Sequence, residues 1–178
     1  MEDARETEIE EWYSHYHQTI FKYILMMTKD YQQAEDLTHE TFLKAFRQHH
    51  TFRQESSPKT WLFRIAHNVT VDYARKQKPV RLIMELFRQK KDSCLLPEHF
   101  VEMKERSQEL YQALEMLKDS HREVIILRKI KGFSISETSE ILGWSETKVK
   151  STLSRAILAL EKTLIKEGYQ DEQRSKLL

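Results

Sequence analysis

The chain of 178 residues carries a formal net charge of +1, and its single cysteine, Cys94, excludes an intramolecular disulfide. Only 3 glycines and 3 prolines interrupt a composition rich in helix formers, which predicts an all-α protein. The sequence has no apolar run of membrane-span length, no secretory leader, no Gly-rich phosphate loop and no zinc-ligand spacing, so we expect a cytoplasmic protein with no metal, no cofactor and no enzymatic activity.

Two helices are predicted before residue 50. Thr7 and Glu10 have the spacing of a capping box, which predicts a helix from about 8 to 28. Asp30 is placed to cap a second helix, from Tyr31 to about His49. Both segments repeat apolar residues at helical spacing, so each is expected to bury one face in a shared core.

A third helix begins at Ser57-Pro58, where a capping residue precedes proline at the first helical position. A loop is predicted just before it, at 51–56, and its apolar periodicity continues to about Lys76. These three helices, with room for a fourth, predict an N-terminal domain over residues 1–78. An extended linker is expected over residues 79–100, which contain two prolines and no sustained period.

A second small domain, of four helices, is predicted over residues 101–168, with a polar tail at 169–178. Helical periodicity returns near Phe100, and Ser120 and Glu123 have capping-box spacing ahead of an apolar run.

The last two helices of this domain have the features of a helix-turn-helix. Ser134 and Glu137 form a capping-box pair, Gly143 suits the left-handed conformation that ends a helix, and Ser145 can cap the next one. That second helix is apolar on one face and carries short polar and cationic side chains opposite, a pattern that can enter a DNA major groove. An ordinary amphipathic hairpin is the alternative interpretation.

Charge is distributed unevenly along the chain. Residues 1–40 hold three basic and ten acidic side chains, a net −7, whereas residues 41–91 hold twelve and three, a net +9; the remainder, with fourteen and fifteen, has −1. This asymmetry predicts an acidic surface for a protein partner and a basic surface for nucleic acid. It also predicts weak DNA binding by the free protein, and therefore DNA recognition within a larger assembly.

Three segments, in this order, resemble the extracytoplasmic-function group of bacterial RNA polymerase sigma factors. AEDLTHETFLKAFR (34–47) is similar to the family's core-polymerase-binding helix, TWLFRIAHNVTVDYARK (60–76) to its −10-reading helix, and ISETSEILGWSETKVKSTLSRA (135–156) to its −35-reading helix-turn-helix. The resemblance spans about 8–164. The chain departs from residues usual in the family at His39, Ser139, Thr152 and Ile157.

The resemblance implies a promoter-specificity subunit with no small-molecule substrate. Its partners would be core RNA polymerase, through the β′ clamp and β, promoter DNA, and an inhibitory anti-sigma factor, often membrane-anchored. A stand-alone helix-turn-helix regulator is the alternative, and it would bind duplex DNA tightly without polymerase. A helical enzyme is a third possibility, for which the sequence supplies no nucleophile, metal or phosphate motif.

Three sets of site residues follow from the resemblance together with side-chain chemistry. Carboxylates around an apolar contact suit a basic partner, and the predicted polymerase-binding residues are Glu35, Asp36, His39, Glu40 and Leu43. Arg and Asn bind base edges and phosphates, and an aromatic ring can stack on an extruded base; the predicted −10 residues are Phe52, Arg53, Ser56, Thr60, Arg64, Asn68 and Arg75. The predicted −35 residues are Thr147, Lys148, Lys150, Ser151, Ser154 and Arg155. The plainer interpretations are a solvated acidic face, a core phenylalanine and surface cations.

The linker must be held stretched in such an assembly. About twenty residues in a random coil span roughly 25 Å, whereas a taut chain reaches about 70 Å. Two DNA sites two helical turns apart are separated by about 70 Å. Core polymerase would supply the scaffold that holds the two domains apart.

Overall fold

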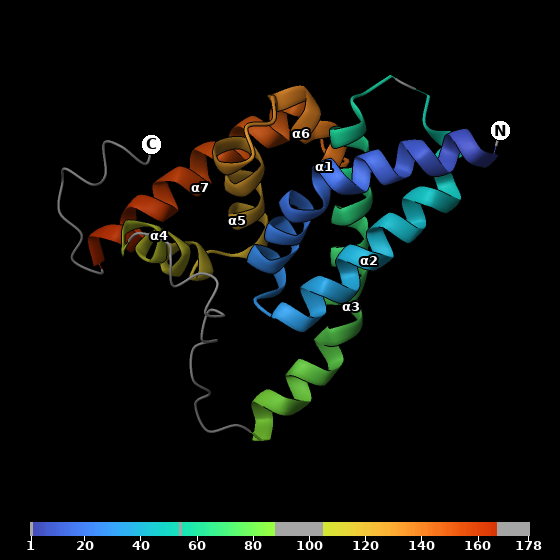
Figure 1. The fold of residues 1–178 in the computed structure, drawn as a ribbon. Helices are drawn as coiled ribbons and strands as arrows, with labels where there is room; N and C mark the ends of the chain where they lie inside the picture. Colours follow the sequence, from blue (N-terminus) through green and yellow to red (C-terminus); the bar gives the residue numbers. More distant parts are fainter. Residues whose placement is uncertain (1, 54, 88–104, 167–178) are drawn as a thin grey trace. The chain divides into compact units, whose positions relative to one another are not determined.

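The computed structural model describes residues 2–53, 55–87 and 105–166, and every regular element within them is helical (Figure 1). The chain divides into two compact units, residues 1–97 and 98–178. The predicted all-α class with two small helical domains is confirmed. The later part of the predicted linker, 88–100, and the predicted tail lie outside the described residues.

The N-terminal unit contains three long helices, α1 (Glu2–Thr28), α2 (Tyr31–Gln48) and α3 (Pro58–Phe87), with a 3₁₀ turn, η1 (His49–Thr51), after α2. α1 and α2 form a hairpin, and α3 packs against both (Figure 1). The largest fully buried side chains of this core are Ile20, Tyr23, Ile24, Leu62, Phe63 and Val69. This packing leaves the outer sides of α2 and α3 available for other contacts.

Local signals set the starts of α2 and α3 as predicted, and an unpredicted left-handed residue follows α1. Lys29 adopts the left-handed conformation, with φ of 60°, and reverses the chain after α1. The Asp30 side chain accepts a 3.0 Å hydrogen bond from the amide of Gln33 and so caps α2. The Ser57 hydroxyl accepts a 3.1 Å bond from the amide of Thr60 at the start of α3.

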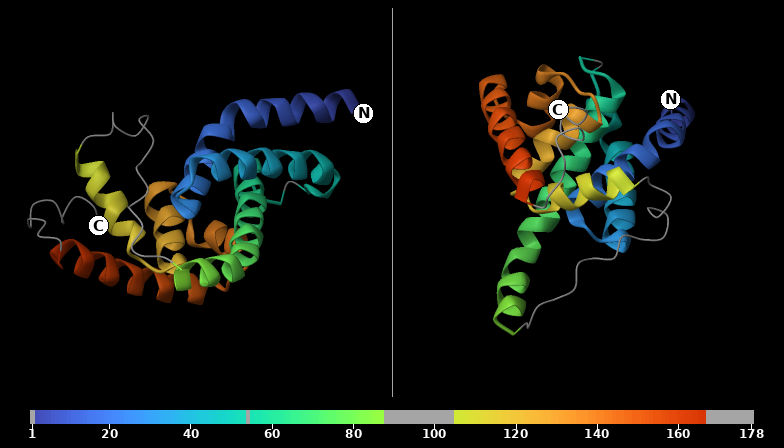
Figure 2. Two further views of the ribbon diagram at one scale, coloured as in Figure 1. Left: turned by 90° about the horizontal axis from the view of Figure 1, so that it is seen from below. Right: turned by 90° about the vertical axis from the view of Figure 1, so that its left-hand side faces the viewer.

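Two predicted helix ends in this unit are wrong. α1 begins at Glu2, so Thr7 lies inside the helix instead of capping it. The same spacing of Thr and Glu also occurs inside helices, and it does not by itself require a helix to begin there. α3 continues past Lys76 to Phe87 and includes Pro79. Proline removes one backbone hydrogen bond and bends a helix without always ending it, and the last part of α3 runs in a different direction from its first part (Figure 2).

The C-terminal unit is built around α7 (Glu146–Lys166). Three shorter helices pack against or beside it: α4 (Glu105–Glu115), α5 (Asp119–Ile125), which continues into the π-helical turn η3 (Ile126–Ile130), and α6 (Ile135–Leu142). Its buried core residues include Leu114, Val124, Ile126, Leu127, Phe133, Ile141, Val149, Ala156 and Leu160. The unit is therefore a four-helix domain, as predicted.

The hairpin of α6 and α7 has the predicted helix-turn-helix caps. The Ser134 hydroxyl accepts a bond from the Glu137 amide at 3.1 Å, and the Glu137 carboxylate accepts one from the Ser134 amide at 2.8 Å. Gly143 is left-handed, with φ of 62°, and the Ser145 hydroxyl caps α7.

The predicted capping box at Ser120 is wrong. α5 begins one residue earlier, at Asp119, and its N-cap is Lys118, which makes no side-chain capping bond. Glu123, the predicted second member of the box, is instead buried in the helix. A tight turn after α4, in which the amide of Leu117 bonds the carbonyl of Leu114, delivers the chain to this start.

Candidate protein and nucleic-acid interfaces

The outer side of α2 presents the five predicted polymerase-binding residues together. All five are exposed, whereas the residues on the opposite side of the helix are buried. At 100° per residue, Leu43 falls in the middle of this set, and its side chain is 57% exposed. We call this surface the α2 acidic face, made of Glu35, Asp36, His39, Glu40 and Leu43. An exposed leucine surrounded by carboxylates is suited to a partner that is both apolar and basic.

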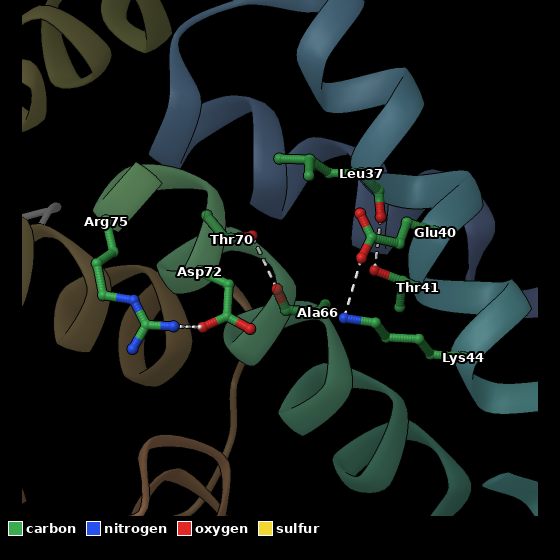
Figure 3. A network of polar contacts seen from close by, with 8 residues as sticks. All are labelled: Leu37, Glu40, Thr41, Lys44, Ala66, Thr70, Asp72 and Arg75. Atoms are coloured by element: carbon green, nitrogen blue, oxygen red, sulfur yellow. Dashed lines mark hydrogen bonds and ion pairs between the residues drawn. The ribbon is translucent and has the colours of Figure 1, made fainter. Parts of the chain in front are cut away.

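One carboxylate of the α2 acidic face is already paired within the helix. The Glu40 carboxylate forms an ion pair with the Lys44 ammonium, with 2.9 Å between Oε1 and Nζ (Figure 3), and both side chains remain partly exposed. Toward the inside, the hydroxyls of Thr41 and Thr70 donate to backbone carbonyls one turn earlier in α2 and α3. These bonds satisfy the hydroxyls, so that two polar side chains can be buried where the helices pack.

The loop between η1 and α3 carries three predicted −10 residues, and they differ in exposure. Arg53 is exposed, Ser56 is half-buried, and Phe52 is half-buried against two tryptophans. The Phe52 ring centroid lies 5.1 Å from that of Trp12 and 5.3 Å from that of Trp61. Phe52 is therefore partly a packing residue, and it retains partial exposure.

The exposed side of α3 carries a polar stripe. Arg64, Asn68 and Arg75 are exposed and fall within about 60° of one another with Val71, which is 45% exposed. The Arg75 guanidinium donates a 3.0 Å bond to Asp72 in the same helix (Figure 3). We call Arg64, Asn68, Val71 and Arg75 the α3 stripe.

Thr60 does not belong to that surface. Its exposed fraction is 0%, and its hydroxyl lies 2.9 Å from the hydroxyl of Ser57 at the start of α3. The structure thus gives Thr60 a role in the helix start, and it has no surface with which to meet a base.

α7 brings the six predicted −35 residues to one side. Thr147, Lys148, Lys150, Ser154 and Arg155 are exposed and Ser151 is half-buried, while Val149 and Ala156 point into the core. We call the six the α7 face. Two of its cations have intramolecular neighbours: the Lys148 ammonium lies 4.1 Å above the Trp144 ring, and the Lys150 ammonium lies 3.5 Å from the Glu146 carboxylate.

Sequence reasoning placed Glu146 at the start of the helix but did not identify its ion pair with Lys150, the contact of Trp144 with Lys148, or the aromatic packing of Trp12 and Trp61 with the loop. For Trp144 and Glu146, the signal in the sequence is their i, i+4 spacing to Lys148 and Lys150. For the tryptophans no local signal exists, because they are brought to the loop by tertiary packing. The turn before α7 has one further bond, from the Ser139 hydroxyl to the carbonyl of Trp144.

Two histidines near these surfaces titrate abnormally. The pKa of His17, on α1, is lowered by burial and by the charge of His39, against an opposing effect of Glu35. The pKa of His121, on α5, is lowered by burial, then by Lys118 and Arg155. Both rings therefore favour the neutral form in the folded protein.

Within the described part of the chain, no helix is long and apolar enough to cross a membrane. The same residues contain no group of three or more His, Cys, Asp or Glu side chains arranged to hold a metal ion.

Comparison with known families gives two adjacent matches. The family model described as Sigma-70 region 2 matches residues 12–80, which include the α2 acidic face and the α3 stripe. The model described as Sigma-70, region 4 matches residues 107–160, which include the α7 face.

Curated relatives match over most of their length. The ECF RNA polymerase sigma factor SigX of Bacillus subtilis is 39% identical over 168 residues, covering 90% of this chain and 87% of SigX. SigM of the same organism, also an ECF RNA polymerase sigma factor, is 38% identical over 169 residues, covering 92% of this chain and 99% of SigM.

Among solved structures, the sigma factor RpoE in complex with the anti-sigma factor NepR from Bartonella quintana matches with a TM-score of 0.71 and 26% identity, over 88% of this chain and 96% of RpoE. CnrH in complex with the cytosolic domain of CnrY has the same fold, with a TM-score of 0.67 and 21% identity, over 92% and 91% of the two chains.

Proposed function

Because this chain belongs to the extracytoplasmic-function group of sigma-70 RNA polymerase sigma factors, we propose that its three exposed surfaces divide promoter recognition among them. The protein is an alternative sigma factor, which binds core RNA polymerase and directs transcription initiation at specific promoters. The α2 acidic face would bind the polymerase, the loop and α3 stripe the −10 element, and the α7 face the −35 element. The observation that carries this assignment is the exposure of three chemically distinct residue sets on α2, α3 and α7.

For the polymerase contact, the α2 acidic face offers Leu43 as an apolar anchor within a ring of carboxylates. The partner would be the β′ clamp helices, with further contacts to β. Substitution Asp36→Lys reverses one charge at an exposed site, so it should abolish association with core polymerase while helical content stays the same. Glu10→Lys, an exposed change of the same kind on α1, is the matched control and should retain association. Retained binding by Asp36→Lys would contradict the assignment.

For the −10 element, the loop would hold a base turned out of the non-template strand. Extruding a base costs a few kcal/mol, which pocket contacts and stacking must offset. Arg64, Asn68 and Arg75 would follow the strand beside the loop, and Thr60 is left out because it is buried. Strand opening would then proceed by capture of the extruded base in the loop. We infer that the chain catalyses no reaction of its own.

Permanganate footprinting of the open complex tests this site. Asn68→Ala and Phe52→Ala should each weaken melting at −10 while the −35 footprint stays in place. Unchanged melting in both variants would remove these residues from the site.

For the −35 element, α7 would enter the major groove of duplex DNA. Arg155 is the preferred candidate for a base contact, because it is exposed and a guanidinium can bond a guanine edge through two donors. Loss of one bidentate contact costs about 1–3 kcal/mol and relaxes one base position. Arg155→Ala should therefore weaken binding mainly to duplexes that carry the preferred base pair.

We further propose that an anti-sigma factor, anchored in the membrane in many systems, sequesters this chain in the cytoplasm by covering its polymerase- and DNA-binding surfaces. Support comes from RpoE, which was solved in complex with the anti-sigma factor NepR. Affinity capture of the tagged full chain from its native cells should recover such an inhibitor, in addition to the subunits of core polymerase.

Transcription in vitro is the decisive test of the function itself. Core polymerase plus this chain, supplied with fragmented genomic DNA, should produce transcripts that start downstream of one shared pair of −10 and −35 sequences. A gel shift provides the complementary control. Tight duplex binding by the chain alone, with no change in start sites when it joins core polymerase, would instead indicate a stand-alone regulator.

A further inference from the structure

The loop that follows α2 is fastened to α1 at its first residues. In η1, the His49 ring forms a 2.8 Å hydrogen bond between its Nε2 atom and the Glu8 carboxylate of α1. The amide of Phe52 donates a 2.9 Å bond to the carbonyl of His49. The position of Phe52 is thus tied through one backbone bond to a residue that α1 holds.

A group of aromatic rings makes a second connection between the same elements. We call Trp12, His49, Phe52 and Trp61 the aromatic cluster. The Trp12 centroid lies 5.5 Å from His49, 5.1 Å from Phe52 and 5.8 Å from Trp61, distances at which tilted and edge-to-face rings attract each other. Trp12 is only 7% exposed, so it is the buried centre of the cluster.

These contacts give α1 control over where the loop lies. The cluster joins the loop to α3 through Trp61, and α1 contributes both a ring, that of Trp12, and a carboxylate, that of Glu8, which contacts His49. Glu8 is half-buried, lies one turn before Trp12 on the same helix, and precedes residues 12–80, which match the family model. A side-chain hydrogen bond between residues of two elements restricts the position of one element relative to the other.

We propose that Glu8 and Trp12 are positioning residues for −10 recognition, acting through His49 to hold Phe52 and the loop in the conformation that captures the extruded base. This inference rests on the proposed −10 function of the loop. If the loop adopts its DNA-binding conformation in only a fraction of the molecules, the apparent affinity for the −10 strand is reduced to that fraction of the intrinsic affinity. If loss of the hydrogen bond between Glu8 and His49 lowers the competent fraction by up to about fivefold, the corresponding free energy is about 1 kcal/mol.

The test uses holoenzyme assembled from core polymerase and the full chain. The probe is a fluorescein-labelled single strand carrying the non-template −10 sequence found by the transcription experiment, with oligo-dT of equal length for comparison. Variants are Glu8→Gln, which removes the negative charge, and Glu8→Lys, which reverses it. Glu10→Gln, on the exposed side of α1, is the matched control.

Wild-type holoenzyme should prefer the −10 strand to oligo-dT. Glu8→Gln should weaken that binding about two- to fivefold, and Glu8→Lys should weaken it at least as much. Affinity for core polymerase and the melting temperature should match those of Glu10→Gln.

Distinct results identify distinct failures. No preference of the wild type for the −10 strand would overturn the function of the loop, and the positioning role with it. Normal binding of the −10 strand by the wild type together with unchanged binding by Glu8→Gln would overturn the positioning role alone. A parallel loss of core affinity or of melting temperature would also overturn it, because the pair would then serve stability alone.

Discussion

Substitution Glu146→Gln should make the chain bind −35 DNA more tightly while making it fold less stably. Glu146 is the first residue of α7, and its carboxylate lies 3.5 Å from the Lys150 ammonium, with the two side chains 50% and 62% exposed. The glutamine removes one negative charge from the end of the helix that would meet DNA phosphates, and it releases Lys150 to bind them.

The size of each effect follows from this geometry. An exposed i, i+4 pair contributes about 0.3–0.5 kcal/mol, and a carboxylate about 8 Å from a phosphate repels it by roughly 0.5 kcal/mol in water before screening. Together these predict a gain of about two- to threefold in DNA affinity at physiological salt. The free energy of unfolding should fall by a similar amount, because an acidic residue at a helix start also stabilises the helix dipole.

Fluorescence anisotropy of holoenzyme on a duplex containing the −35 element, at three salt concentrations, measures the affinity and its salt dependence. Glu161→Gln makes the same charge change about 22 Å farther along α7 and should leave affinity nearly unchanged. Weaker binding of Glu146→Gln to every duplex would refute the reasoning. A loss confined to duplexes with one particular C·G pair would also refute it, since the carboxylate would then accept a bond from cytosine.

Other changes have equally direct outcomes. Leu43→Ala should weaken core binding at least about fivefold in a pull-down titration without altering the melting temperature, because an exposed anchor costs about 1 kcal/mol or more when truncated; unchanged binding would exclude it as an anchor. Ser134→Ala removes the α6 cap and should cost about 1 kcal/mol, lowering the melting temperature of the C-terminal unit by several degrees, whereas Ser136→Ala should not. The lowered pKa of His17 means that the unfolded chain binds more protons below pH 6.5, so stability is fully present above that pH and declines as the pH falls through it. Urea unfolding at pH 7.5 and 5.5 should show this decline reduced in His17→Gln, and an identical decline would contradict it.

The sequence predicted those parts of the fold that local chemistry controls. Asp30, Ser57 and Ser134 cap helices where expected because each hydroxyl or carboxylate bonds an amide within three residues. Gly143 ends α6 because glycine adopts positive φ without strain. Two local signals predicted helix ends that the structure does not have. Thr7 and Glu10 have capping-box spacing but lie inside α1, and Pro79 lies within α3 although prolines usually end helices.

The candidate site could be predicted only in part, for a related reason. Helical spacing placed Arg64 and Asn68 on one exposed side of α3, but it placed Thr60 there as well. Thr60 is buried because the start of α3 turns its hydroxyl toward Ser57. The packing of Trp12 on Phe52 joins residues forty positions apart, and no periodicity within either segment encodes that contact.

The extension of α3 through Phe87 shortens the tether between the two units. Each helical residue advances about 1.5 Å where an extended one advances about 3.4 Å, so the nine residues 79–87 reduce the greatest possible reach by about 17 Å. A promoter with a longer spacer would leave less extended chain in reserve, and unwinding of this helical segment to engage it would cost backbone hydrogen bonds. Tolerance for spacer length should therefore be asymmetric, with added base pairs reducing initiation more steeply than removed ones.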